Sequence, residues 1–330
     1  MGIWFVATLV LWGCSERGYQ LLSGSTMGTY YRIQANCPVQ IVAADIDEQL
    51  RRFNAIFSTY EPASELSQLN LESTQRWHRV SESMMTVLAA ADVLVRESGG
   101  AFDPTVGALV NLWGFGPEDQ ELAPDAGAIA AARAQTGFEV LELDPGVPAV
   151  RSTKPRKLDL SAIAKGRAVD ELSTALLQLN CTAALVDIGG EIRVFGESPS
   201  TRPWRLAIEQ PGELSARAPA LPVLNLTEGA VATSGDYRNY RELDGRRLSH
   251  LIDPRSAGPV THRLASVTVW HPEAMWADGY ATAISVLGPE AGQVLANRAK
   301  LAVAMLIRTE DGRFSPWMSE AFISRFVTPD

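Results

Sequence analysis

The spacing of apolar residues predicts several helices in the first half of the chain. Residues 45–58 place apolar side chains at intervals of three and four, as on one face of an amphipathic helix. A second helix is expected between Ser81, a favourable N-cap, and Gly99, which would end it. Two more helices are expected at 125–136 and at 164–180.

Strand patterns alternate with these helices and become dense in the second half. GTYYRIQA (28–35) alternates, and AALVDI follows the helix at 164–180 directly. Asp244-Gly245 between two alternating runs indicates a hairpin, and ASVTVW (265–270) reads as a buried strand. A helix containing ADGYATA (277–283), a last helix at 289–299 and two further strands complete the chain. Helices and antiparallel strands mix without a βαβ rhythm, which favours one α+β domain.

Composition and charge narrow the class of protein. The chain has 330 residues, of which 46% are hydrophobic and 20% charged, enough apolar side chains for a sizeable core. Lys and Arg number 29 against 38 Asp and Glu, for a formal net charge of -9. Because no block of basic residues could follow a phosphate backbone, nucleic acid is not expected as a partner.

The N-terminus resembles an export signal. About a dozen apolar residues, too few to span a membrane, end at Leu11-Trp12-Gly13-Cys14, which looks like a bacterial lipobox. The expected organisation is a lipoprotein signal peptide at 1–13, a lipidated Cys14 with a linker at 14–22, and one domain at 23–330. The alternative is a buried N-terminal strand, since no Lys or Arg precedes the apolar run. Cys37 and Cys181 could pair in an oxidising compartment or remain two isolated thiols.

Familiar catalytic and nucleotide-binding motifs are missing. The sequence contains no GxxxxGK[ST], GxGxxG, GxSxG or HExxH pattern. Instead, Gly- and Asp-rich turns stand at the ends of the predicted elements, where backbone N–H groups can approach an anion closely. These turns are GSTMGT (24–29), GGAFDPTVG (99–107), LDLSAIAKG (158–166), DIGGE (187–191), ATSGDY (232–237) and SHLIDP (249–254). Each one alone is equally typical of an ordinary turn.

Four side chains offer chemistry, two of them in ADGYATA and two in the turns named above. On a helix, Asp278 and Thr282 point the same way, and two hard oxygens at this spacing suit Mg²⁺. The alternative is a helix-capping acid and a hydroxyl that bonds back to the backbone. His250, in a polar turn, is suited to act as a base or a phosphate contact. Lys165 lies near a helix start, where it would either meet an anion or be solvated.

Taken in order along the chain, these motifs, together with FSTYEPASELSQLN, resemble the FAD:protein FMN transferase family. This family is also called ApbE, the flavin transferases, and was earlier described as a thiamine-biosynthesis lipoprotein. The resemblance runs from about residue 23 to 310. It implies a single large α+β domain, related to the T-fold, with mainly antiparallel sheets flanked by helices. It also implies a Mg²⁺-dependent enzyme that moves FMN from its substrate FAD to a Ser or Thr of a target protein and releases AMP.

The resemblance assigns roles to individual residues. Flavin contacts are expected at Met27, Tyr60, Ala101, Phe102, Asp103, Asp159, Lys165 and Ile252. The metal is expected at Ala162, Asp278, Ala281 and Thr282. His250 would assist catalysis as a base, together with Asp278.

The same resemblance implies partners and a location. The partners would be flavin-acceptor proteins such as redox-pump subunits, and the location the periplasmic side of a bacterial membrane, with a lipid anchor at Cys14. Two alternatives stay open: a Mg²⁺-dependent FAD pyrophosphatase that releases FMN and AMP, and a lipoprotein that binds FAD without turnover.

Overall fold

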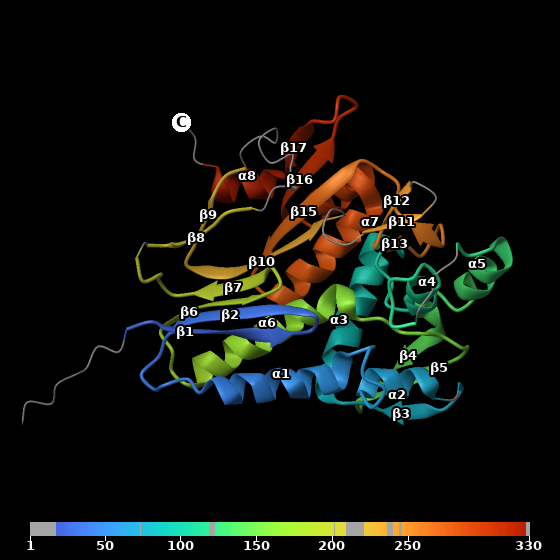
Figure 1. The fold of residues 1–330 in the computed structure, drawn as a ribbon, viewed down its shortest axis with the longest axis horizontal. Helices are drawn as coiled ribbons and strands as arrows, with labels where there is room; N and C mark the ends of the chain where they lie inside the picture. Colours follow the sequence, from blue (N-terminus) through green and yellow to red (C-terminus); the bar gives the residue numbers. More distant parts are fainter. Residues whose placement is uncertain are drawn as a thin grey trace, which may run out of the picture.

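The computed structural model describes residues 18–72, 74–118, 123–200, 202–208, 221–235, 240–243 and 246–327. Its core is an eight-stranded antiparallel sheet with the strand order β1-β2-β6-β7-β10-β15-β16-β17 (Figure 1). These strands are β1 (Gln20–Thr26), β2 (Thr29–Asn36), β6 (Ala183–Ile188), β7 (Glu191–Phe195), β10 (Glu228–Gly235), β15 (Leu264–His271), β16 (Ala302–Arg308) and β17 (Phe314–Met318).

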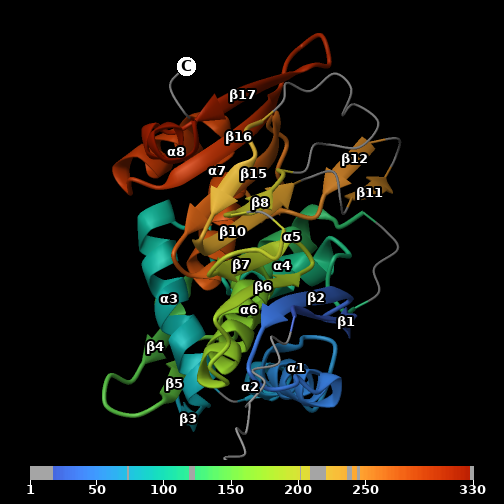
Figure 2. The same ribbon diagram turned by 90° about the vertical axis from the view of Figure 1, so that its left-hand side faces the viewer.

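Helices cover both faces of this sheet, and Figure 2 shows α1 and α8 at opposite ends of the molecule. The helices are α1 (Ala43–Phe57), α2 (Glu65–Leu71), α3 (Glu82–Ser98), α4 (Gly107–Leu112), α5 (Ala126–Arg133), α6 (Ser161–Gln178), α7 (Ala274–Arg298) and α8 (Glu320–Phe326). α6 packs on β6 and β7, and α7 packs on β10 and β15. α8 packs on β16 from the other face.

Short strands form four small sheets around this core. They are β3 (Trp77–Arg79), β4 (Leu141–Leu143) and β5 (Ala149–Ser152), then β8 (Trp204–Leu206) with β9 (Leu224–Leu226), β11 (Tyr240–Leu243) with β12 (Arg246–Ser249), and β13 (Ile252–Asp253) with β14 (Gly258–Pro259). The β11–β12 pair joins Leu243 to Arg246, as expected for a hairpin at Asp244-Gly245, although those two residues lie outside the described part. The mixed helices and antiparallel strands confirm the α+β prediction.

The coverage of both sheet faces explains the apolar runs in the central strands. In β10, Ala230 and Ala232 belong to the main core, whereas Val231 between them packs in the cluster beneath α8. A strand exposed on one face would alternate apolar and polar residues, but these strands have no solvent face. The hydrophobic strand predicted at 265–270 is therefore β15, which lies in the middle of the sheet.

Helix caps formed where the sequence predicted them. Ser81 accepts a hydrogen bond from the Met84 amide at the start of α3, and Gly99 ends it in the left-handed conformation. The two helices expected around ADGYATA and Pro289 are both present, and α7 joins them across a non-helical Gly288. The sequence did not predict α2, α4 or α8, which are too short to show a periodic pattern.

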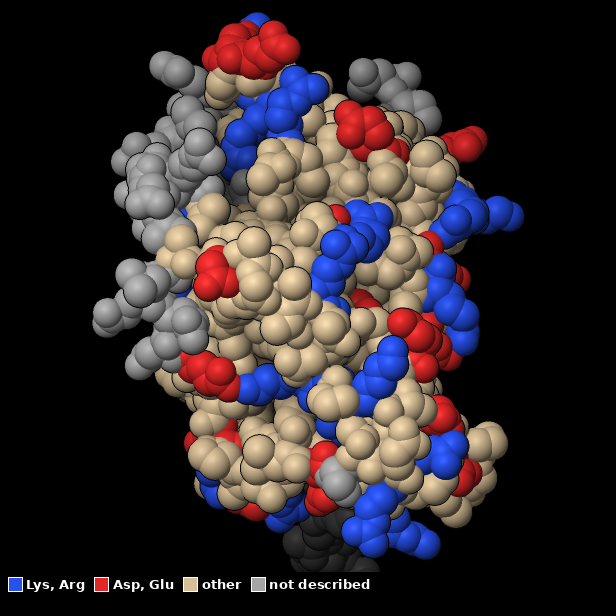
Figure 3. All heavy atoms as spheres, turned by 90° about the vertical axis from the view of Figure 1, so that its right-hand side faces the viewer, with Lys and Arg blue, Asp and Glu red and all other residues tan. Residues whose placement is uncertain are grey.

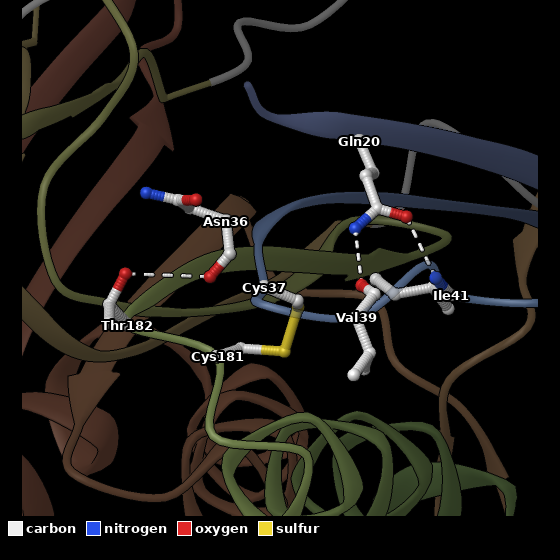
Figure 4. The surroundings of a disulfide bond; sticks show 7 residues. All are labelled: Gln20, Asn36, Cys37, Val39, Ile41, Cys181 and Thr182. Atoms are coloured by element: carbon white, nitrogen blue, oxygen red, sulfur yellow. Dashed lines mark hydrogen bonds between the residues drawn. A yellow bond between two sulfur atoms is a disulfide. The ribbon is translucent and has the colours of Figure 1, made fainter. Parts of the chain in front are cut away.

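Cys37 and Cys181 form a disulfide, which the sequence left open (Figure 4). Cys37 follows β2 and Cys181 precedes β6. These two strands already pair with each other, and Asn36 opposite Ala183 is the pair nearest the disulfide. Gln20 secures the neighbouring loop, because its amide group donates to the Val39 carbonyl and accepts from the Ile41 amide. The disulfide and Gln20 together fasten the outer edge of the sheet.

The chain start falls outside the described residues as far as residue 17, including the predicted signal peptide and Cys14. β1 begins at Gln20, so regular structure starts within the segment expected to be linker. Its Leu22 packs against the main core, which accounts for the strand forming there. No helix in the described part has the length and apolar character needed to cross a membrane.

Candidate functional site

The candidate site forms where α6 and α7 cross at Gly166. A Cβ at this position would lie 2.8 Å from Met275 Cα and closer still to the Ala274 carbonyl group. Only glycine allows the two backbones to approach so closely, because any larger residue would overlap with backbone atoms that cannot rotate away. Gly166, the single glycine of the LDLSAIAKG motif, therefore sets the distance between the helices.

Each of the two helices supplies a buried carboxylate to the backbone of the other. Asp278 on α7 accepts a hydrogen bond from the Gly166 amide at 2.9 Å. Asp170 on α6 accepts from the Ala274 and Met275 amides, both at 2.9 Å, and so caps the start of α7. Arg193 on β7 pairs with Asp170 at 2.6 Å and offsets its charge. These reciprocal bonds fix the register of α6 against α7.

Lys165 and Glu191 complete a charged cluster around Asp278. The Lys165 ammonium lies 2.8 Å from Glu191 Oε1 and 3.8 Å from Asp278 Oδ1. Asp278 is 2% exposed, and this burial raises its pKa to about 7, with the charge of Glu191 adding to the effect and the Lys165 ammonium opposing it. A buried carboxylate with a raised pKa beside a cation is typical of a functional site.

Glu191 was not predicted as a site residue, although its motif was noticed. It begins β7 directly after Gly189 and Gly190, which both have positive φ and allow the chain to reverse between β6 and β7. The Gly190 amide donates to Asp187 Oδ1, which closes the turn. The resulting orientation leaves Glu191 only 4% exposed and facing Lys165. The sequence signal that could have identified Glu191 is an acidic residue directly after a Gly-Gly turn.

The residues expected at the metal site supply a suitable set of oxygen atoms. Ala162 lies on α6 one turn before Gly166, whose amide donates to Asp278, and Ala162 has only its backbone carbonyl to offer a cation. Thr282 lies one turn beyond Asp278 with its hydroxyl 3.4 Å from Ser234 Oγ of the ATSGDY motif. Ala281 is fully buried and has only its backbone carbonyl to offer. Carbonyl, carboxylate and hydroxyl oxygens fit Mg²⁺. In the described part, no group of three or more His, Cys, Asp or Glu gathers as a metal cage.

The GGAFDPTVG turn and the LDLSAIAKG segment lie side by side. The Asp159 amide donates to the Pro104 carbonyl at 2.7 Å, and the Gly107 amide donates to the Lys157 carbonyl. Asp103 is buried, and its carboxylate accepts bonds from the Thr105 amide and hydroxyl and from the Phe138 amide. Burial raises the pKa of Asp103, although these bonds oppose the shift. The Asp103 carboxylate therefore holds the turn together.

A cavity of about 670 Å³ adjoins this segment. Asp159 and Thr59 line it together with polar and basic side chains that include Asn70, Arg156 and Lys157. Tyr60, next to Thr59, is 68% exposed, and desolvation and the charge of Asp159 raise its pKa. Two of the predicted flavin contacts, Tyr60 and Asp159, thus lie near each other, and Asp159 lines the cavity. Lys165 and Asp278 do not line it, so the cavity and the charged cluster are distinct parts of the region.

The remaining predicted flavin contacts and His250 lie in the GGAFDPTVG turn, the SHLIDP segment and the β1–β2 turn. Ala101 packs with Leu251 and Val286, which joins the first turn, the SHLIDP segment and α7, while Phe102 is buried in the main core. Ile252 packs with Leu109 of α4.

His250 lies between β12 and β13, where Ser249 accepts from the Leu251 amide and the Phe115 ring stands 6.5 Å away, edge-on. Met27 occupies the β1–β2 turn, and the Tyr30 carbonyl after it accepts from the Gly189 amide of the DIGGE turn. The motifs scattered along the sequence are therefore neighbours in the fold.

The face that carries α4, α5 and the β11–β14 strands shows no continuous basic area. In Figure 3, Lys and Arg form separate groups that lie between Asp, Glu and uncharged residues. A surface that binds nucleic acid gathers basic residues on one face. The mixed charge on this face agrees with the absence of basic runs in the sequence.

The fold and site define a class of protein: an antiparallel α+β chain in which Lys165 of α6 faces two buried acids, Asp278 of α7 and Glu191 of β7. The chain belongs to the ApbE family, whose model matches residues 27–307. It is 40% identical to the FAD:protein FMN transferase of Vibrio cholerae over 97% of each chain, and 38% identical to that of Klebsiella pneumoniae over 92% of this chain and 88% of the relative.

Solved structures agree with this assignment. The flavin transferase ApbE from Vibrio cholerae superimposes with a TM-score of 0.85 at 37% identity, covering 93% of this chain and 99% of the other. The flavinyl transferase ApbE of Pseudomonas stutzeri in its apo form also gives 0.85, at 35% identity and 94% and 98% coverage. The family and fold expected from the motifs are thereby confirmed.

Proposed function

We propose that this chain is an FAD:protein FMN transferase that attaches FMN, taken from FAD, to a Ser or Thr of an acceptor protein and releases AMP. The observation that carries the proposal is the charged cluster at the α6–α7 crossing. The cluster occurs in a chain that matches named FAD:protein FMN transferases over nearly its whole length. FAD and the acceptor are therefore the proposed substrates.

The divalent cation proposed for this reaction is Mg²⁺, held by Asp278, Thr282 and the Ala162 carbonyl. It would supply positive charge to the diphosphate of FAD as negative charge develops on the leaving AMP. Lys165, 31% exposed, would orient the diphosphate from the other side of Asp278. Met27, Tyr60 and Asp159, with the turn held by Asp103, would bind the rest of FAD, and the cavity beside Asp159 is large enough for one end of it.

In the transfer step, the acceptor oxygen forms a new bond to the phosphorus of the FMN half. The bond from that phosphorus to the oxygen of the AMP half breaks. His250 would take the proton from the acceptor hydroxyl, since imidazole is a common general base in enzymes. Its position in the turn between β12 and β13, with Leu251 packed against Ala101 and α7, supports this role.

The test combines the purified chain, FAD and Mg²⁺ with an acceptor domain that carries the target Ser or Thr. We expect flavin fluorescence to remain on the acceptor after denaturing electrophoresis, together with one equivalent of AMP. Release of FMN and AMP at the same rate without acceptor would instead identify a pyrophosphatase. If FAD stayed intact with the acceptor present, and Asp278→Ala left flavin binding unchanged, the chain would be a binding protein.

We also propose that the protein is lipid-anchored at Cys14 on the periplasmic side of a bacterial membrane, where it would meet acceptors such as redox-pump subunits. The lipobox-like segment and the Cys37–Cys181 disulfide support this location, because disulfides persist in oxidising compartments. Labelled palmitate should be incorporated into the wild-type protein and not into Cys14→Ser. Labelling of both would refute the anchor at Cys14.

A further inference from the structure

The ammonium group of Lys165 lies unevenly between two buried carboxylates. It stands 2.8 Å from Glu191 Oε1, which is hydrogen-bond distance, and 3.8 Å from Asp278 Oδ1, which is beyond it. Asp278 Oδ2 is committed to the Gly166 amide. Asp278 Oδ1, which is the more distant of the two acid oxygens from Lys165, is therefore the one through which Asp278 would bind a cation.

Lys165 and a divalent cation would compete for this oxygen. Like charges repel, and the repulsion is weakly screened at a buried site, so an ammonium bonded to Asp278 would oppose a second cation there. Lys165 has a long, flexible side chain on α6 and can reach either acid. Its position is decided by the carboxylate that holds it more firmly.

Glu191 is well placed to hold it. It starts β7, and its backbone pairs with Ile188 of β6, so its position is fixed by the central sheet. Its side chain is buried, and Oε2 has no hydrogen-bond partner among the described residues. Because no described donor contacts Oε2, the carboxylate is directed at Lys165 alone.

We propose that Glu191 is a positioning residue that holds Lys165 away from Asp278 and so leaves Asp278 Oδ1 open to the divalent cation. The inference rests on the cation site of the proposed function. It assigns Glu191 an indirect role, since the residue acts through Lys165 and does not bind the metal itself. With both acids ionised, the cluster has a net charge of -1, and neutralising Glu191 brings it to zero.

The test measures Mn²⁺ binding in the absence of flavin, by the electron paramagnetic resonance signal of free Mn²⁺. Glu191→Gln keeps the size of the side chain but releases Lys165 toward Asp278, and we expect its Mn²⁺ dissociation constant to rise about tenfold or more. Lys165→Met removes the competitor, so this variant should bind Mn²⁺ no more weakly than the wild type. In a Lys165→Met background, Glu191→Gln should have an effect several times smaller.

Two results would overturn the inference while leaving the cation site intact. One is an equal effect of Glu191→Gln with and without Lys165, which would mean that Glu191 acts directly on the cation. The other is weaker Mn²⁺ binding in Lys165→Met alone, a variant that remains informative even if Glu191→Gln does not fold. Wild-type Mn²⁺ binding no tighter than that of Asp278→Ala would instead refute the cation site itself, and the inference with it.

Discussion

Gly166→Ala is the smallest change that tests whether the α6–α7 crossing assembles the site. The added methyl group would lie 2.8 Å from Met275 Cα and closer to the Ala274 carbonyl, so it collides with backbone. Relief requires the two helices to move apart. That movement stretches the bond between the Gly166 amide and Asp278, which is 2.9 Å long in the wild type.

The size of the effect follows from three contributions. Overpacking a close-packed core costs about 1–3 kcal/mol. A buried carboxylate that loses a hydrogen-bond donor costs about 1–3 kcal/mol more. Alanine is about 1 kcal/mol better than glycine inside a helix, which offsets part of this. The net loss is about 1–5 kcal/mol, and with an unfolding entropy near 2.1 cal/mol/K per residue the Tm should fall by about 1–7 °C.

Thermal unfolding followed by circular dichroism measures the first effect, and flavin transfer to an acceptor measures the second. Gly279→Ala on α7 is the matched control. Its methyl group would meet the end of the Leu94 side chain, with Ile163 Cδ1 next at 3.6 Å, and a side chain can rotate where backbone cannot. We expect Gly166→Ala to lose more stability and at least about tenfold more transfer rate than the control. Equal losses in the two variants would refute the claim that backbone contact at the crossing sets the site.

Three further predictions concern the acid, the base and the disulfide. Because the pKa of Asp278 is raised to about 7, the folded state retains a proton that the unfolded state has lost above pH 4. The metal-free protein should therefore lose stability as the pH rises from about 4 to about 7. The Tm, measured in the presence of a chelator, should depend less on pH in Asp278→Asn than in the wild type. His250→Ala should slow transfer about 100-fold or more with FAD affinity unchanged in a fluorescence titration, and equal losses of both would contradict a role as base. The Cys37–Cys181 bond links residues that are 144 positions apart in the sequence. The double variant Cys37→Ser, Cys181→Ser should therefore have a free energy of unfolding that is lower by about 2–5 kcal/mol in denaturant titrations. An unchanged midpoint would show that the bond adds no stability.

Local signals in the sequence were sufficient for the elements that end in strong caps. Ser81 marks the start of α3 because its hydroxyl can accept a hydrogen bond from a first-turn amide, and Gly99 marks its end because only glycine readily takes the left-handed conformation. α8 has an equivalent cap at Ser319, yet with seven residues it is too short to show a period. The strand order of the sheet could not be predicted from the sequence, because the residues of apolar strands such as β10 and β15 do not indicate which strand they pair with.

The candidate site was predictable only as far as its motifs were recognised. Asp278 and Thr282 follow from helical spacing, and Lys165 from its place near a helix start. Glu191 and Asp170 were missed because their importance comes from contacts across the fold: one faces Lys165 from the sheet, and the other caps a helix about 100 residues later in the chain. A single sequence does not reveal which buried acid faces which cation.

Because α6 and α7 each supply a carboxylate that bonds to the backbone of the other, the site can form only after both helices have been synthesised. Residues 161–178 are synthesised well before residues 274–298, and in the interval Asp170 has no helix to cap and the Gly166 amide has no Asp278. The proposed cation site therefore forms only when the last quarter of the chain docks onto the earlier part. A truncated or partly folded chain lacks both Asp278 and the register of α6 against α7, so the proposed metal binding, followed during refolding, would report completion of the tertiary fold.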